Sequence, residues 1–510
     1  MQSVSSTELQ GNTHKGWLIS IVMSIVVASV LVFASSQEKK WLLAGMLGII
    51  GIFGCCVLQR KLWQLLLLLI VFVIPLRIDF YLLYKPTYFV QTHGVPGLPV
   101  SSFDILLIPL SFYLCLKALR GGEKIDFYPS ISIPALAYLV LSGISAFHSA
   151  DRPLSFAVLV LMIKSYVAFL FFANRIKTRA DLSLAVFGLI VGVLLQSFVG
   201  TLQYVSGGSF LKGVFGVPEA AFKMQVQGEF ILSRVGGTIG HPNSLAKYLS
   251  FCIPVLITYS FVRVNPHRLD PYVRKLALVT AMVGAVTLLL TMSRGSWVAL
   301  GLTFMFLFYE AFRRFLKSRA KAMVAVLLLN AVLAGAALTI FEDVRIRLFE
   351  DDYNRAQARL PMAMVALNVI KHQPIKGVGL NNYTRVMYLY DRTREWQTYK
   401  FPHPVHNSFL LIAAESGVPA LIAFLCLIGG VFTKAWSALR RLDSPVALLQ
   451  VGWMGGLMTW LIAGMFDRDF AGTNVMLWFT MAAIVATSRI LSAEKEMDKA
   501  YETESARHWA

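Results

Sequence analysis

The sequence predicts an all-α fold, a polytopic transmembrane helical bundle of about 12–14 helices with a large, partly helical loop on one side. Three observations support this class. The 510-residue chain is 56% hydrophobic and 15% charged, with a mean hydropathy of +0.63, a balance that soluble proteins of this size do not have. Apolar runs long enough to cross a bilayer recur along the whole chain. These runs are continuous and not alternating, which disfavours a membrane β-barrel.

The first helix is expected at 17–35. This run is too long for the core of a signal peptide and lacks a clear small-residue cleavage site, so we expect it to be retained. Apolar runs predict the remaining helices at 41–58, 62–76, 101–118, 131–149, 154–173, 183–206, 244–262, 275–293, 295–313, 321–341, 407–433, 445–466 and 473–491.

Basic residues fall on alternate connections between these helices. Because positive charge in short loops marks the cytoplasmic side, these connections and both termini are predicted to be cytoplasmic, with an even number of helices. The same loops explain most of the net charge of +19, which in a soluble protein would suggest nucleic acid. The clusters are Arg60/Lys61, Lys117/Arg120/Lys124, Arg175/Lys177/Arg179, Arg263/Arg268/Arg274/Lys275, Arg313/Arg314/Lys317/Arg319/Lys321 and Lys434/Arg440/Arg441.

The opposite face carries three longer segments, 77–100, 207–243 and 342–406. The last holds ten Lys and Arg against seven Asp and Glu. Long translocated loops escape the charge rule, so topology does not explain this excess and we interpret it as functional.

A short helix is predicted inside the long loop, at 361–371. Pro361 suits a first helical position, where a missing N–H costs nothing. Met362, Val365, Ala366 and Ile370 share one side, which we expect to lie on the membrane surface.

Two polar stretches on the predicted outer face interrupt the apolar pattern. RVGGTIGHPNSLAKY (234–248) is a glycine-rich loop running into a helix that Asn243 or Ser244 can cap. It is either an anion site built from backbone N–H groups or a plain loop-to-helix turn, and it lacks the ending of a Walker loop. In TMSRGSW (291–297), Arg294 lies between two apolar runs, where it either faces a polar cavity or snorkels.

The stretch FPHPVHNSFLLIAAESG (401–417) places imidazoles before an apolar run. Asn407 is expected to cap that helix, which would hold His406 at its outer mouth. A histidine titrates near neutral pH and can take a proton from a hydroxyl group. Glu415 either orients a polar group in the bundle or packs beside Gly417.

Together these motifs resemble the O-antigen ligase and polymerase superfamily of bacterial inner-membrane glycosyltransferases. The resemblance follows the order of parts over roughly residues 230–435. These parts are GGTIGHPNSLA, then SRG, then an arginine-led helix followed by HQPIKGVGLNNY, then HNSFLLIAAESGVPALIAFL. The residues before 230 are similar only in forming helices. We therefore divide the chain into 1–229, a core at 230–435 that includes the periplasmic loop 342–406, and 436–510.

The resemblance implies transfer of a glycan from undecaprenyl pyrophosphate to a hydroxyl acceptor, such as a lipid A core, at the periplasmic face of the inner membrane. It implies that His406 is the catalytic base and that Arg294 and Arg359 hold the pyrophosphate. Arg234 is a further basic contact. The expected chemistry inverts the anomeric centre and uses no metal or other cofactor. The expected partners are the lipid-linked glycan, the acceptor and membrane lipids, and no nucleic acid.

Metal sites are not expected from the other candidate ligands. All five cysteines lie in apolar runs without metal spacing. Pro404 separates His403 from His406. Asp467-Arg468-Asp469 resembles the Asp-x-Asp pattern of sugar-nucleotide transferases, but such pairs are common by chance.

Three alternatives to a ligase stay open at this point. A polymerase of the same superfamily has the same motifs. A lipid-linked sugar transporter would explain many helices and buried arginines, although it predicts inverted repeats that the chain does not show. A scaffold could bind anionic polymers through the basic loop alone.

Overall fold

The computed structural model describes residues 62–76, 79–82, 84, 95–208, 222–227, 230–261, 270–315, 342–350, 357–394, 396–439, 444–468 and 471–509, with the isolated residues 321, 324, 335 and 339. The helices expected at 17–35 and 41–58 lie outside the described residues, as does nearly all of the one expected at 321–341.

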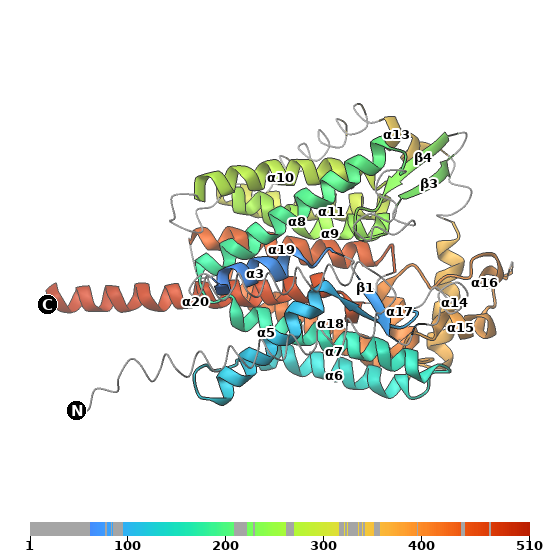
Figure 1. Ribbon diagram of the computed structural model, residues 1–510, viewed down its shortest axis with the longest axis horizontal. Coiled ribbons are helices and arrows are strands. Elements are labelled where there is room, and N and C mark those ends of the chain that lie inside the picture. The colour runs from blue at the N-terminus through green and yellow to red at the C-terminus, as the bar shows by residue number, and fades with distance from the viewer. Residues whose placement is uncertain are drawn as a thin grey trace.

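Long helices dominate the described part of the chain, which confirms the predicted fold class. Nine of the described helices are long and apolar enough to span a membrane. Two other apolar helices, α3 (Leu62–Phe72) and α11 (Arg294–Phe315), run beside them (Figure 1). The nine are α5 (Ser102–Leu119), α6 (Pro129–Ala146), α7 (Arg152–Arg175), α8 (Arg179–Val205), α9 (Pro242–Phe261), α10 (Asp270–Leu290), α18 (Val418–Leu439), α19 (Pro445–Gly464) and α20 (Val475–Trp509).

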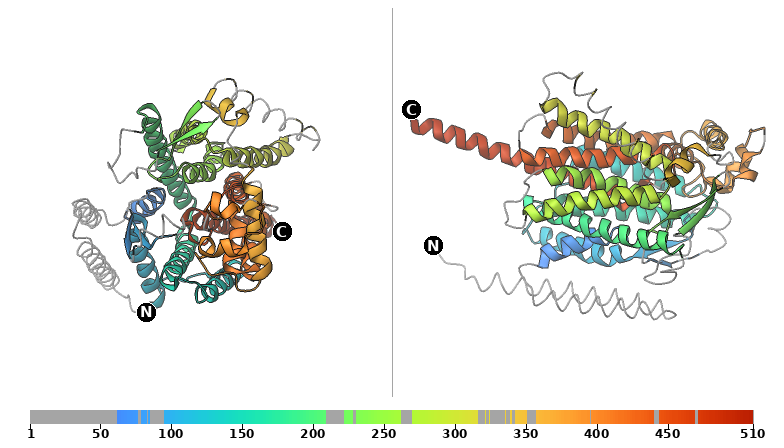
Figure 2. Two further views of the ribbon diagram at one scale, coloured as in Figure 1. Left: turned by 90° about the vertical axis from the view of Figure 1, so that its right-hand side faces the viewer. Right: turned by 90° about the horizontal axis from the view of Figure 1, so that it is seen from above.

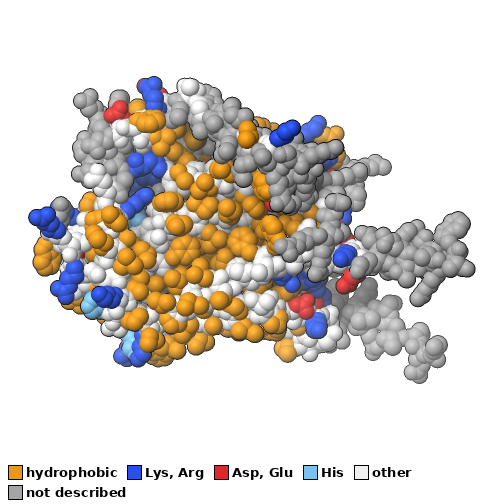
Figure 3. Space-filling view, turned by 180° about the vertical axis from the view of Figure 1, so that it is seen from behind, with side chains coloured by type: hydrophobic (Ala, Val, Ile, Leu, Met, Phe, Trp, Pro, Cys, Tyr) orange, Lys and Arg blue, Asp and Glu red, His pale blue; other side chains and the backbone are white. Residues whose placement is uncertain are grey.

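The surface of the bundle is apolar where a bilayer would surround it. Side chains that face outward from the spans, such as Ile133, Val140 and Phe198, are more than half exposed. Figure 3 shows a broad apolar surface with Lys and Arg gathered toward its ends. Inside, α19 packs on α9 and α11, and the indoles of Trp453, Trp460 and Trp478 are fully buried. The protein is therefore a multi-pass membrane protein.

Two antiparallel hairpins were not predicted. The first pairs β1 (Asp79–Leu82) with β2 (Leu98–Ser101), and the second pairs β3 (Phe222–Gln227) with β4 (Phe230–Val235). Their strands of four to six residues are too short for the alternation to stand out in sequence.

The hairpins and the short helices gather at one end of the bundle, and α20 projects from the other end (Figures 1 and 2). The short elements are α13 (Glu342–Phe349), α14 (Arg359–His372), α15 (Tyr383–Val386), η3 (Met387–Tyr390), α16 (Gln397–Lys400) and α17 (Ser408–Ser416). One more short helix, η4 (Ala471–Thr473), precedes α20.

Two expectations about this end are wrong. The helix expected at 407–433 is two helices, α17 and α18, which meet at Gly417. The apolar side of α14 does not lie on a membrane surface. Met362, Val365 and Ala366 are buried, and α14 packs on α17 in a small hydrophobic core of its own. That core is formed by Val365, Ala366, Val369, Val378, Tyr383, Met387, Val405, Leu411 and Ala414.

Candidate functional site

The end of the bundle that carries the hairpins also gathers charged side chains that are distant in sequence. β4 contacts α9, α10 and α13. The first residues of α11 lie against the segment after α19, because a Cβ built on Gly295 would be 3.1 Å from the Cβ of Phe466. Segments that are distant in the sequence thus meet at one end of the bundle.

Arg234 bridges two of these loops from strand β4. Its Nε donates to the carbonyl oxygen of Thr291 at 3.0 Å, and its Nη2 donates to Oδ1 of Asn243 at 2.7 Å. Lys223 is its direct partner across the hairpin. Like charges directly opposite each other destabilise a strand pair, so this arrangement favours an anion beside the hairpin.

The glycine-rich loop that follows β4 is held by two glutamines of α8. The amide oxygen of Gln203 accepts from the N–H groups of Gly236 and Gly237, and that of Gln196 accepts from the N–H of Thr238. These N–H groups are therefore satisfied inside the protein. The interpretation of this loop as an anion site made of backbone N–H groups is wrong, and the loop instead fixes the positions of the residues that flank it.

The helix after this loop is capped by His241, and not by Asn243 or Ser244 as expected. The carbonyl oxygen of His241 accepts from the N–H of Leu245 at 3.0 Å, and its Nδ1 accepts from the N–H of Asn243 at 3.2 Å. Pro242 follows as the first helical residue, where proline fits best.

Arg294 begins α11 directly after a tight turn. Met292 in that turn has a positive φ of 52°, and its carbonyl oxygen accepts from Nε of Arg347 at 3.2 Å. Arg347 belongs to α13 and is only 7% exposed. The turn thus places two guanidinium groups at the same end of the bundle, and Arg347 was not singled out in the sequence.

His406 lies directly before the cap of α17, as expected. Asn407 caps the helix, because its Oδ1 accepts from the N–H groups of Phe409 and Leu410 at 3.0 Å each. Nδ1 of His406 lies 3.1 Å from the carbonyl oxygen of Pro404. A carbonyl only accepts, so Nδ1 carries the proton and the lone pair of the neutral ring is on Nε2.

The charges around His406 come from distant parts of the chain. Burial is the largest influence and lowers its pKa. Asp467 and the Pro404 carbonyl raise the pKa, whereas Arg468 and Arg359 lower it further. The net shift is downward, which keeps the ring neutral at neutral pH.

Asp467 connects α17, α9 and the end of α19. Its Oδ2 pairs with Nζ of Lys247 at 3.0 Å, and its carbonyl oxygen accepts from Oγ of Ser408 at 3.1 Å. Burial would raise the pKa of Asp467, but Lys247, His406 and His241 outweigh it and hold the pKa at about 2. The carboxylate therefore stays ionised.

The Asp467 carboxylate is used as an ion-pair partner. Among the described residues, no group of three or more His, Cys, Asp or Glu could hold a metal ion. Asp469 lies outside the described residues. The absence of a metal site remains a prediction from sequence.

The turn at 374–379 is joined to the end of α17. The N–H groups of Val378 and Gly379 donate to the carbonyl oxygens of Ala414 and Glu415 at 2.9 and 3.1 Å. The N–H of Val418 donates to the carbonyl oxygen of Pro374 at 2.8 Å. The first two bonds satisfy carbonyl groups that the end of α17 leaves open. The HQPIKGVGLNNY motif thus supports the helix that begins beside His406.

Glu415 reaches from α17 to the turn at 381–383, which comes earlier in the chain. Its Oε1 accepts from the N–H of Tyr383 at 3.2 Å, and the carboxylate is 4% exposed. Burial raises its pKa to about 7, although backbone N–H groups of Asn381, Tyr383 and Asn382 oppose the rise. Glu415 therefore orients a polar turn, which was one of the two expected roles.

Replacing Glu415 with glutamine is expected to remove a pH dependence of stability. The folded protein holds this proton up to about pH 7 and the unfolded chain releases it near pH 4.5, so wild-type stability falls as pH rises between these values. Glu415→Gln should be more stable than wild type at pH 8, by up to about 3 kcal/mol, with no such difference at pH 4. Thermal unfolding in detergent across this range measures it. Glu342→Gln, at a side chain that is 73% exposed, is the matched control.

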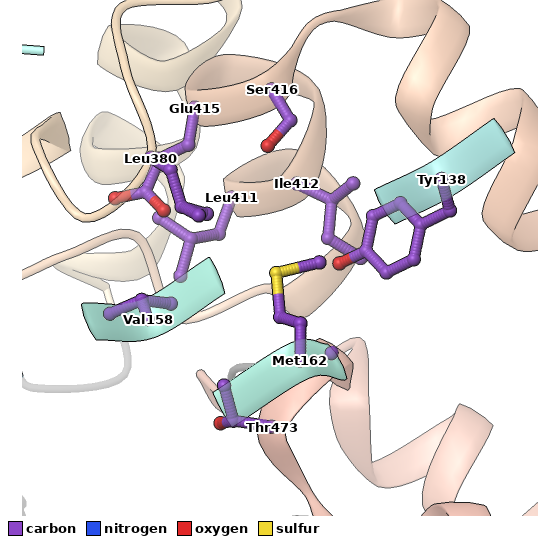
Figure 4. Close-up of a pocket in the computed structure, with 10 residues that line it drawn as sticks. Tyr138, Val158, Met162, Leu380, Leu411, Ile412, Glu415, Ser416 and Thr473 are labelled. Atoms are coloured by element: carbon purple, nitrogen blue, oxygen red, sulfur yellow. The ribbon is translucent and has the colours of Figure 1, made fainter. Parts of the chain in front are cut away.

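A small cavity of about 20 Å³ lies beside Glu415 and Ser416. Figure 4 shows Tyr138, Met162 and Ile412 turned toward one another there, with the Glu415 carboxylate turned away from Tyr138. This volume admits a water molecule but no diphosphate. None of the four predicted site residues lines it.

The four predicted residues lie at one end of the bundle. His406 and Arg359 are close enough for Arg359 to lower the pKa of His406. Arg234 acts in the same way on His241, and Arg294 begins a helix that packs on α19. The sequence missed Lys223, His241, Lys247, Arg347 and Arg468. Of these, Lys247 had a signal, since a charged residue inside an apolar helix is a functional candidate.

The fold and the site define a class: a multi-pass helical membrane protein with a mainly cationic polar site at one end of the bundle. Residues 277–425 match the family model described as O-antigen ligase. This match confirms the resemblance to the O-antigen ligase superfamily seen in the sequence. The match begins in α10 and ends in α18, so it includes Arg294, Arg359 and His406 but not Arg234. No curated protein matches the chain.

Proposed function

We propose that this membrane glycosyltransferase moves a glycan from undecaprenyl pyrophosphate to a hydroxyl acceptor at the periplasmic face of the bacterial inner membrane. The match of residues 277–425 to the O-antigen ligase family supports a membrane glycosyltransferase of the ligase or polymerase type. The observation that carries the proposal is the protonation of the His406 ring nitrogens and the charges that surround them. Its Nε2 lone pair is available, and its pKa is influenced by Arg359, Arg468 and Asp467.

The transfer is a single displacement. Nε2 of His406 takes the proton of the acceptor hydroxyl while the acceptor oxygen bonds to the anomeric carbon. The bond from that carbon to the phosphate oxygen breaks, and undecaprenyl pyrophosphate leaves with the electron pair. Attack opposite to the leaving group inverts the anomeric centre. The imidazolium formed on His406 is stabilised by the Asp467 carboxylate.

The arginines stabilise the leaving group. Arg294 and Arg359, with Arg234 as a further contact, hold the pyrophosphate through charge-assisted hydrogen bonds. Fixed cations aimed at the developing charge can replace a divalent ion. Transfer should accordingly continue in the presence of EDTA.

The direct test uses purified protein in detergent with a radiolabelled lipid-linked glycan and candidate acceptors. Formation of a new glycosidic product supports the proposal, whereas movement of intact donor across vesicles without a product indicates a transporter. The surface polysaccharide of a deletion strain identifies the acceptor. Loss of attachment to lipid A core indicates a ligase, and single repeat units indicate a polymerase.

Replacing Asp467 with asparagine should move the pH profile of transfer. The carboxylate raises the pKa of His406, so its removal lowers that pKa further and weakens the base. The acidic limb of the rate profile should shift to lower pH, and the rate at pH 7 should fall. Initial rates between pH 4 and 8 measure both.

The control for this variant concerns Lys247, whose buried ammonium group would lose its ion pair with Asp467. Combining Asp467→Asn with Lys247→Met removes both charges and should recover stability. The acidic limb of the rate profile should stay at the lower pH in this double variant. An unshifted limb in both variants would contradict the role of Asp467.

A further inference from the structure

A second imidazole, His241, lies near the Asp467 carboxylate and has the opposite tautomer to His406. Its Nδ1 accepts from the N–H of Asn243 at 3.2 Å. A backbone N–H only donates, so Nδ1 carries no proton and the ring proton is on Nε2. His406 thus presents a lone pair at Nε2, and His241 presents an N–H at Nε2.

The surroundings of His241 keep it uncharged. Burial is the largest influence and lowers its pKa; Lys223, Arg234 and Arg468 lower it further, and Asp467 alone opposes them. The resulting pKa of about 3 means that His241 does not titrate at physiological pH. It can donate a hydrogen bond to an anion without adding to the repulsion among its cationic neighbours.

Capping alone does not explain a histidine at this position. Asparagine, aspartate and serine are preferred at the residue before a helix, and each would accept the Asn243 N–H with a shorter side chain. The ring extends beyond what the cap needs. Around it, Lys223 and Arg234 are direct partners across the β3–β4 hairpin, a repulsive pairing that a bound anion would relieve.

We propose that His241 binds the donor directly, its Nε2–H donating to a phosphate oxygen of the diphosphate that occupies the cluster formed by Lys223, Arg234 and Arg468. The inference rests on the proposed function and deepens it. The cations supply attraction, and His241 supplies a directional donor that orients the diphosphate. Because His241 is neutral and its lone pair is taken by Asn243, it does not compete with His406 for the acceptor proton.

His241→Asn separates this role from capping. The asparagine Oδ1 reaches the Asn243 N–H, so the cap is kept, but nothing replaces Nε2–H. We expect an unchanged melting temperature and a roughly ten-fold or greater loss of affinity, since hydrogen bonds to charged groups are among the stronger ones. The probes are inorganic pyrophosphate and undecaprenyl pyrophosphate without glycan, measured by calorimetry on the full-length protein in detergent.

His241→Gln is the second variant. Its amide nitrogen reaches the position of Nε2 while the cap is lost, so affinity should recover relative to His241→Asn and the melting temperature should fall. Unchanged affinity in His241→Asn overturns the inference, as does a His241→Gln affinity no better than that of His241→Asn. Loss for the lipid-linked probe alone would place the contact on the lipid side and overturn the assignment to phosphate.

This experiment is independent of the chemistry of transfer. If wild type binds both probes but forms no glycosidic product, the proposed function fails while the His241 contact is still measured. If wild type transfers glycan and His241→Asn binds both probes normally, only the inference about His241 fails.

Discussion

His406→Ala is expected to lower glycan transfer by about 10²–10⁴-fold, because a positioned general base contributes this much to rate. The Nδ1–H bond to Pro404 places the lone pair on Nε2, and the cap at Asn407 fixes where the ring stands. Alanine keeps the backbone and the cap, so the variant should fold. Initial rates with a labelled lipid-linked donor measure the loss.

The matched control is His372→Ala. This histidine is exposed at the end of α14, where its ring contacts the carbonyl oxygen of Asn368 within the same helix. Its loss should leave transfer unchanged. Wild-type rates in His406→Ala would rule out the proposed base. Affinity for undecaprenyl pyrophosphate should persist in that variant, since the base acts on the acceptor.

Gly417→Ala is expected to prevent stable folding. Gly417 has φ 89° and ψ 162°, a region that residues other than glycine almost never occupy. A Cβ there would lie 2.0 Å from the carbonyl oxygen of Ile375. Backbone strain and overlap together should cost about 4 kcal/mol or more, the range of the most damaging single substitutions. Thermal unfolding and the yield of monodisperse protein in detergent measure the effect.

Gly429→Ala is the control for Gly417→Ala. Gly429 lies on α18, and a Cβ there would have no neighbour within 4 Å. Alanine is also the better helix former, by roughly 1 kcal/mol. We expect normal or slightly raised stability. A stable, active Gly417→Ala would show that the turn at 374–379 and α17 are not held as closely as described.

The fold class was predictable because it depends on local composition. Apolar runs, and basic residues on alternate loops, indicate the membrane-spanning helices even when the packing of these helices is unknown. The start of α17 was predictable for the same reason, since Asn407 caps its own helix. The end of α17 was not. It is set by bonds from residues 374–379, some 40 positions earlier in the chain, and Gly417 by itself does not distinguish a break from a kink.

Individual residues of the candidate site were predictable where their type is unusual for the neighbouring sequence. Arg294 interrupts apolar sequence, and His406 precedes a recognisable cap. The glycine-rich loop was interpreted as a possible anion site, but Gln196 and Gln203 of α8 accept hydrogen bonds from its N–H groups. This could not be predicted, because the glutamines lie far from the loop in the sequence. His241 was overlooked because its partners Lys223 and Arg468 are close to it only in the folded chain.

The bonds between Pro374 and Val418 and between Val378 and Ala414 hold the two ends of the segment 374–418 together. The segment from the turn at 374–379 through α15, α16 and the loop with His406 therefore forms a closed loop, because its two ends are hydrogen-bonded to each other. The amide protons of Val378, Gly379 and Val418 should exchange with deuterium slowly and at similar rates, while those near the tip at Tyr399 exchange fast. Movement of the segment around Tyr399 would therefore leave the bonds at 374–379 and 414–418 in place.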